Sequence, residues 1–276
     1  MSMATDSRPR LERPPAPPRP WTRGRVTGWV LVGLWALAGL GFVIYLYNAW
    51  NIDLVEKYGP RYWSGLKTTI VLVGLSLIAG AILSLPVALA RLSRNPLVNG
   101  IAYAYVYFFR GTPLLAQAFL IYYGIGQFSA ELRSIGLWWF FRDAWNCAFL
   151  AFTLNTAAYQ AEILRGAIQS VPKGQWEGAA SLGIRPWYTF LRIILPQALI
   201  VALRPYGNEI ILMIKGSAIV AIITVYDLMG ETRRAFSRTF DFQTYLWAAV
   251  IYLAIVETLR NVWDLIEKRL TRHLIR

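Results

Sequence analysis

The chain has 276 residues, of which 56% are hydrophobic and only 16% are charged. Soluble globular proteins carry about 25% charged residues, so the composition predicts an integral membrane protein. The net charge of +13 is also found in nucleic-acid-binding proteins, but here the basic residues lie in blocks between apolar segments. That distribution follows the positive-inside rule of membrane proteins and argues against a nucleic-acid partner. With one cysteine, Cys147, the chain forms no intramolecular disulfide, and with one histidine, His273, it lacks the ligands of a Cys/His metal site.

The first 25 residues are rich in proline and arginine and have almost nothing to bury. We expect residues 1–25 to form a disordered cytoplasmic arm, although a role in binding a partner is the alternative. Val26 to Tyr47 then carries no charge and exceeds the roughly 20 residues that span a bilayer. It is too long for the core of a signal peptide, so we expect a retained N-terminal helix. With the polar stretch after it, a periplasmic loop, it makes up residues 26–62.

Five further apolar segments are long enough to cross the membrane. They are 66–90, 97–123, 144–168, 191–214 and 245–263. Together with the first helix they predict an all-α integral membrane protein of about six transmembrane helices, with both termini in the cytoplasm. Four basic residues fall on the outside in this scheme and count against it: Lys215, Arg233, Arg234 and Arg238.

The third predicted span, residues 97–123, is interrupted by four residues: Arg110, Gly111, Thr112 and Pro113. An arginine at membrane depth is costly unless it faces protein or water. We therefore expect this run to face the inside of the bundle, and we predict that Arg110 packs between helices or at an interface instead of binding solute.

A polar segment between the fourth and fifth spans, residues 173–196, reads as helix, turn, helix. Gln175 to Leu182 contains good helix formers, and Glu177 is expected in the first turn, where a carboxylate meets the positive end of the helix dipole. Gly183 stands where a glycine ends a helix, and Pro186 stands where a proline begins one. Small residues give this first helix a face without bulk, which suits docking in a cleft: Gly178, Ala179 and Ala180. The alternative is a loop that only joins two membrane helices.

This segment resembles the EAA loop of ATP-binding cassette importer permeases. Glu177, Ala179 and Gly183 match that pattern, as do Ile193, Leu195 and Pro196 further on. The departure is Gly178 in place of the first alanine, which weakens the helix by roughly 1 kcal/mol. Three more blocks resemble the polar amino acid permeases of this class: FRGTPLLAQ at 109–117, NTAAYQAEILRGAIQSVPKGQ at 155–175 and NEIILMIKGSAI at 208–219. Within that family the chain is most similar to the permeases for histidine, lysine, arginine, ornithine and opines.

The resemblance implies a type I importer core of five helices in residues 63–276, preceded by one extra helix. It also implies a location in the bacterial inner membrane, in contact with lipid. The implied partners are two ATP-binding cassette ATPase subunits, a second permease subunit (a related chain or a copy of this one) and an extracytoplasmic solute-binding protein. The loop from Glu177 to Gly183 would then sit in a cleft on the ATPase.

The chain itself is expected to catalyse nothing. It contains no Gly-Lys pair and therefore no phosphate-binding P-loop. It also lacks a Ser-His-Asp set, a metal-ligand cluster and paired catalytic carboxylates. ATP and Mg²⁺ would be used by the partner ATPase, with no cofactor in this chain.

Polar residues on the fourth helix predict the solute path. Asn155, Tyr159 and Glu162 follow the spacing i, i+4, i+7 and share one stripe, and Gln117 lies one turn past the interruption in the third helix. Such stripes normally face the bundle interior or a water-filled cavity. In one interpretation they line the path, with Glu162 attracting a cationic solute. In the other they bond between helices, with Glu162 paired to Arg165 at i+3.

Glu209 and Lys215 on the fifth helix form a second candidate polar pair, which we expect to be structural.

Two other functional classes stay open at this point. A stand-alone secondary transporter would be expected to show internal repeats, of which none is convincing, and a membrane-bound enzyme would need the missing catalytic clusters.

Overall fold

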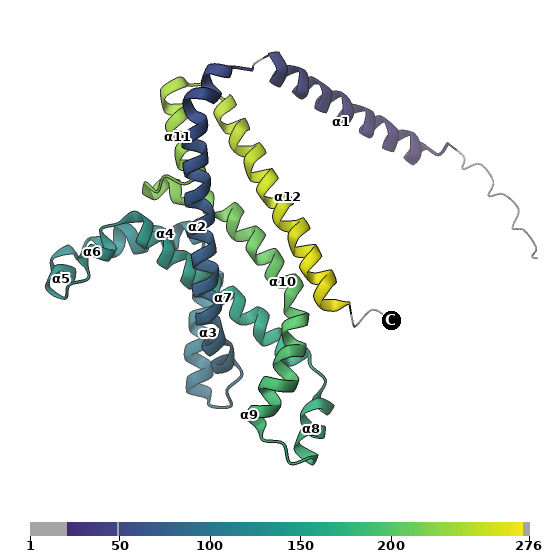
Figure 1. The fold of residues 1–276 in the computed structure, drawn as a ribbon, viewed down its shortest axis with the longest axis vertical. Coiled ribbons are helices and arrows are strands. Elements are labelled where there is room, and N and C mark those ends of the chain that lie inside the picture. The colour runs from purple at the N-terminus through teal and green to yellow at the C-terminus, as the bar shows by residue number, and fades with distance from the viewer. Residues whose placement is uncertain (1–20, 49, 273–276) are drawn as a thin grey trace, which may run out of the picture. The chain divides into compact units, whose positions relative to one another are not determined.

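The computed structural model of the chain describes residues 21–48 and 50–272 (Figure 1). The chain divides into two compact units, residues 1–52 and 53–276. Within the described residues every regular element is a helix, which confirms the predicted all-α class. His273 and residues 1–20 of the predicted arm lie outside the described residues.

The first unit contains α1, Arg23–Asn48, which begins three residues before the predicted span. Its 26 residues, at about 1.5 Å of rise each, exceed the thickness of the bilayer's hydrocarbon core. Within this unit no residue of α1 is buried.

The second unit contains all the other helices. In chain order they are α2 (Ile52–Arg91), α3 (Pro96–Gly111), α4 (Leu114–Phe119), η1 (Leu120–Gly124), α5 (Ser129–Ser134), α6 (Trp138–Phe141), α7 (Ala144–Ser170), α8 (Lys173–Ser181), α9 (Pro186–Thr189), η2 (Phe190–Ile194), α10 (Leu195–Gly216), η3 (Ser217–Ile223), α11 (Leu228–Thr239) and α12 (Gln243–Thr271). α8 and α9 lie at one end of this unit and α11 lies at the other (Figure 1).

Three helical runs within the described residues are long and apolar enough to cross a bilayer: Arg23–Asn48, Ile52–Arg91 and Pro186–Ile223. The last of these joins α9, η2, α10 and η3 in one continuous stretch. α7 and α12 are also long, with 27 and 29 residues. The membrane fold is thus confirmed, while the number of six crossings stays a prediction.

The stretch expected as a periplasmic loop is helical from Ile52 onward, because α2 extends over 40 residues. Its first turns carry a buried stripe of Leu54, Tyr58 and Tyr62, spaced four residues apart, which packs in one cluster with residues of α11 and α12. The Tyr62 hydroxyl donates a hydrogen bond to the carbonyl oxygen of Thr244 at 2.8 Å. The loop assignment was wrong because the mixed charges of this stretch hid its helical spacing.

The third predicted span is interrupted where the sequence indicated. α3 ends at Gly111, Thr112 adopts an extended conformation, and Pro113 is the N-cap of α4. A single π-helical segment, η1, follows α4 without a break. The four-residue motif is therefore a joint between two helices.

α7 is the central helix of the second unit, with 14 buried residues. Its buried alanines, such as Ala151, Ala157 and Ala161, let neighbouring helices approach closely. At Gly80 of α2 an added Cβ would collide with the Thr156 side chain. α2 and α7 therefore cross at a point where only glycine fits.

The turn before α11 rests on α2. The side chain of Asp227 caps α11 by accepting a hydrogen bond from the Gly230 amide at 2.8 Å, and the Leu228 amide donates to the Thr69 hydroxyl at 3.0 Å. A Cβ added at Gly65 would lie 2.7 Å from the Asp227 carbonyl oxygen. These contacts fix the end of the molecule opposite α8.

Candidate functional site

The predicted helix–turn–helix is present as α8 and α9. Gly183 has φ of +69°, and the turn is a Schellman motif in which the Gly183 amide donates to Ala180 and the Ile184 amide to Ala179, both at 3.0 Å. Pro186 begins α9 as predicted. The position of Glu177 was wrong: α8 starts at Lys173, so Glu177 is its fifth residue and lies beyond the first turn.

Nearly all of α8 and α9 faces outward. Glu177, Gly178 and Ala180 are exposed, and Ala179 is the buried residue of α8. Large apolar side chains on and around these helices are also exposed: Trp176, Leu182, Trp187 and Tyr188. Apolar side chains gathered at one polar end of a molecule are typical of a protein-binding surface. We refer to residues 173–189 as the coupling element.

The coupling element is joined to the central helix by a packed cluster. Phe190 and Ile194 of η2 are buried together with Leu164 and Ile168 of α7, and Val171, directly before α8, belongs to the same cluster. Interiors packed in this way transmit displacement because they have low compressibility. A force on α8 and α9 would therefore reach α7.

Gln117 and Asn155 lie together at the joint between α3 and α4. Gln117 Nε2 donates to the carbonyl oxygen of Phe109 at 2.9 Å and to the hydroxyl of Thr112 at 2.8 Å. Asn155 Nδ2 donates to Gln117 Oε1 and to the same Phe109 oxygen, both at 3.0 Å. Both amides are buried and supply partners to the backbone groups that the interruption leaves unpaired.

Glu162 is surrounded by arginines. Arg91 Nε donates to its Oε1 at 3.0 Å, Arg165 Nη2 donates to its Oε2 at 2.7 Å, and Arg110 Nη1 lies 4.0 Å from Oε2. The ion pair expected from the i+3 spacing is therefore present. Arg91 was not among the predicted site residues, because its pairing with Glu162 across 71 residues has no local signal in the sequence.

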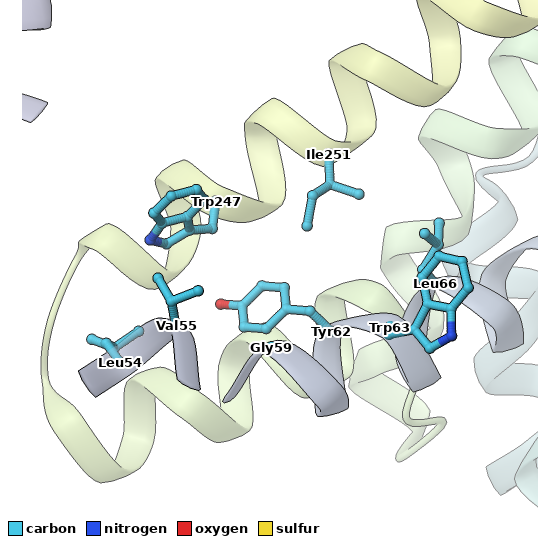
Figure 2. A pocket seen from close by; sticks show the side chains of 8 residues that line it. All are labelled: Leu54, Val55, Gly59, Tyr62, Trp63, Leu66, Trp247 and Ile251. Carbon is cyan, nitrogen blue, oxygen red and sulfur yellow. The ribbon is translucent and has the colours of Figure 1, made fainter. Parts of the chain in front are cut away.

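A cavity of about 350 Å³ in another part of the second unit lies between α2 and α12 (Figure 2). Its walls are apolar, and its lining residues are Leu54, Val55, Gly59, Tyr62, Trp63, Leu66, Trp247 and Ile251. Figure 2 shows the polar side-chain atoms in its wall: the indole nitrogens of Trp63 and Trp247 and the hydroxyl of Tyr62, which already donates to Thr244. This cavity has no charged group with which to orient a polar solute.

A cavity of about 310 Å³ opens beside Glu162, and its lining contains charged and aromatic side chains. Tyr159, Glu162, Arg110 and Gly111 from the predicted set line it, together with Arg91, while Gln117 and Asn155 do not. The four residues predicted for the solute path therefore separate into two groups. Gln117 and Asn155 form a buried pair at the joint, whereas Tyr159 and Glu162 lie in the cavity wall. We refer to this space as the arginine cavity.

Glu209 was expected to pair with Lys215, which was wrong. The Thr156 hydroxyl donates to Glu209 Oε1 at 2.9 Å, and Gln160 Nε2 donates to Thr156 in turn at 3.0 Å. Glu209 is buried whereas Lys215 is exposed, and the two form no ion pair within the described part of the chain. The helix directs them to different faces because they are six residues apart.

Known proteins share both the sequence and the fold. Residues 65–273 match the family of binding-protein-dependent transport system inner membrane components. The nopaline transport system permease protein NocM of Agrobacterium fabrum is 43% identical over 225 residues, which cover 81% of this chain and 93% of that protein. The arginine ABC transporter permease protein ArtM of Escherichia coli K12 is 36% identical over 213 residues, 77% of this chain and 96% of that one.

A crystal structure of an amino acid ABC transporter with histidines superposes with a TM-score of 0.70 at 35% identity, over 80% of this chain and 99% of that one. The MetNI methionine ABC transporter, at 19% identity and a TM-score of 0.64 over 76% of this chain and 96% of that one, shares the fold. The family match covers residues 65–273 of the second unit, which begins at residue 53. It includes the coupling element and the arginine cavity. The chain therefore belongs to the binding-protein-dependent transport system inner membrane components and is a permease subunit of an ATP-binding cassette importer.

Proposed function

We propose that this permease imports polar amino acids of the basic or opine type across the bacterial inner membrane. The names of its relatives support this solute class, because they include nopaline, octopine and arginine permeases. The observation that carries the mechanism is the packed cluster that joins the coupling element to α7. The same helix supplies Tyr159 and Glu162 to the wall of the arginine cavity.

ATP and Mg²⁺ bind to partner ATPase subunits in this proposal, two copies for each transporter. The exposed face of the coupling element, with Glu177, Gly178 and Ala180, sits in a cleft on one ATPase. When nucleotide closes the ATPase pair, α8 and α9 move, and the cluster around Ile194 carries the displacement to α7. ATP can drive this change only if it binds one of the two states more tightly.

A second permease subunit completes the pathway, either a related chain or a copy of this one. An extracytoplasmic binding protein delivers solute at the end that carries α11, and the coupling element faces the cytoplasm. Both termini are placed in the cytoplasm as well. Residues 63–276 form the type I core, and α1 is an additional membrane helix.

Reconstitution tests this proposal. The permease complex, its ATPase and its binding protein are placed in proteoliposomes, and uptake of L-arginine, L-histidine and nopaline is measured with ATP inside. We expect uptake that needs ATP and the binding protein and that stops when Glu177→Arg reverses the charge on the coupling element. Uptake driven by a proton or sodium gradient without ATPase would instead indicate a secondary transporter. A Lys268→Gln variant, at an exposed position near the end of α12 and outside the coupling element, serves as a control for surface charge and should leave uptake unchanged.

A further inference from the structure

The arginine cavity has an excess of positive charge. Arg91, Arg110 and Arg165 surround Glu162. Glu209 does not line this cavity, and its buried side chain accepts a hydrogen bond from Thr156. Among the residues that line the cavity, the two guanidinium groups of Arg91 and Arg110 face one carboxylate, that of Glu162, which leaves one positive charge in excess.

Glu162 has no free oxygen with which to attract a cationic solute. Oε1 accepts hydrogen bonds from Arg91 and Arg165, both at 3.0 Å, and Oε2 accepts two from Arg165 at 2.9 Å and 2.7 Å. Its side chain is 13% exposed. A cationic group entering the cavity would have to displace an arginine that already holds the carboxylate.

Arg110 is the arginine that remains available. Its side chain is 44% exposed, against 13% for Arg91 and 26% for Arg165. Its one ion-pair contact, with Glu162, is 4.0 Å long, and its guanidinium donates no hydrogen bond to any residue that the structure describes. The guanidinium lies over the Tyr159 ring, 5.1 Å from the centroid. The ring therefore stabilises the positive charge through a cation–π interaction with one face of the guanidinium. The N–H groups of the guanidinium are not used by this interaction and can donate to another group.

An arginine at membrane depth with unused donors is stabilised by water or by an anion. The planar guanidinium fits a carboxylate through two parallel hydrogen bonds, which makes this pair stronger than one between neutral groups. The cavity of about 310 Å³ falls within the range of small-molecule sites, roughly 300–1,000 Å³. Tyr103 and Tyr107 add further aromatic groups to its wall.

We propose that Arg110, supported by Tyr159, binds the carboxylate of the transported solute. This inference rests on the proposed import function and assigns the anionic end of the solute to a named residue. The cavity then selects for a free carboxylate, and Glu162 serves to hold Arg91 and Arg165 in place. Opines and amino acids both carry the required group.

The test measures solute binding to the purified permease–ATPase complex in lipid nanodiscs. The binding protein is left out so that its own selectivity does not contribute. The probes are L-arginine, L-histidine and nopaline, and the amides L-argininamide and L-histidinamide, which keep the amino group and side chain but lack the carboxylate. We expect the wild-type complex to bind L-arginine and L-histidine about 10- to 100-fold more tightly than their amides, since a hydrogen bond to a charged group contributes about 1.5–3 kcal/mol. Nopaline, which keeps its free carboxylates, should bind as the amino acids do.

Arg110→Gln should reduce the affinity for the acids to that for the amides and leave the amides nearly unchanged. Arg110→Lys should retain part of the preference because it keeps the charge. Arg94→Gln, at an exposed arginine in the turn after α2, is the matched control and should keep the wild-type preference. If Arg110→Gln fails to assemble, phenylglyoxal labelling of Arg110 in the wild-type complex provides the same information, because L-arginine should protect the residue and L-argininamide should not.

Equal binding of acid and amide by the wild type, or an unchanged preference in Arg110→Gln, would overturn this assignment. The same conclusion follows if none of the probes binds the wild-type complex at millimolar concentration, or if both forms of arginine protect equally. ATP-driven uptake by the wild-type complex, measured in proteoliposomes, separates the two proposals. If the complex takes up solute but shows no preference for the acid over the amide, only the proposed role of Arg110 is wrong. If there is no ATP-driven uptake, the proposed import function is wrong.

Discussion

The coupling element and the arginine cavity are built in opposite ways. The coupling element is held by its own turn, and its outward face has small and apolar side chains that are exposed. The polar groups around the joint and the cavity are bonded to one another, and the bonds Asn155–Gln117 and Arg91–Glu162 join residues 38 and 71 positions apart in the sequence. A surface made for another subunit leaves its groups unpaired, whereas polar groups inside a membrane bundle must be paired.

The largest effect should come from breaking the ion pairs of Glu162. Glu162→Gln leaves Arg91 and Arg165 with an uncharged partner in a largely buried place, and loss of one partner of a buried pair destabilises by about 3–5 kcal/mol. We expect a clear fall in the melting temperature of the purified complex. Uptake of cationic and neutral solutes should fall by the same factor.

The control is the double variant Glu162→Gln with Arg165→Gln, which removes one of the unpaired charges and should recover part of the stability. A stable Glu162→Gln complex that loses only the uptake of cationic solutes would show that Glu162 attracts the solute. The cavity would then resemble the coupling element, because Glu162 would interact with the solute and not only with groups of the permease.

Next in size is the joint between α3 and α4. Gln117→Met keeps the shape of the side chain but removes three hydrogen bonds that Gln117 donates and one that it accepts from Asn155. Buried groups without partners cost about 1–3 kcal/mol. We expect lower thermal stability and faster amide exchange at Thr112 and in the first turn of α4.

Gln127→Met, in the turn before α5 where the side chain is exposed, is the control for the joint and should change little. If Gln117→Met leaves stability unchanged but abolishes solute binding, then Gln117 belongs to the solute path as the spacing first indicated.

The third prediction concerns the backbone conformation of the turn in the coupling element. Gly183→Val places a β-branched residue at φ of +69°, and the left-handed conformation costs about 1–2 kcal/mol for a residue other than glycine. An added Cβ meets nothing within 4 Å, so the effect is one of conformation and not of crowding. We expect normal membrane insertion but loss of coupling between ATP hydrolysis and uptake.

Gly183→Asn tests this reason, because asparagine tolerates the left-handed region, and it should retain most of the coupling. Full coupling in Gly183→Val would show that the ATPase does not depend on the geometry of this turn.

Much of the coupling element could be predicted because its signals are local. Gly183 and Pro186 mark the end of one helix and the start of the next within four residues. The start of α8 was missed because Gly174, a poor helix former, lies inside the helix. In the membrane core the spacing on α7 found Asn155 and Glu162, but their roles depend on Gln117 and Arg91. Those partners come from other helices, so only the tertiary structure brings them together.

The smallest effect should come from Gly178, the residue at which the coupling element departs from its family pattern. Gly178→Ala raises helix propensity by about 1 kcal/mol, and the new Cβ meets no atom within 4 Å. We expect amide exchange in α8 to slow by about fivefold, with the ratio of solute imported to ATP hydrolysed unchanged. Ala180→Gly is the matched control and should speed exchange by a similar factor. A fall in uptake with Gly178→Ala would mean that the ATPase approaches the α8 backbone so closely at this point that even a methyl group is excluded.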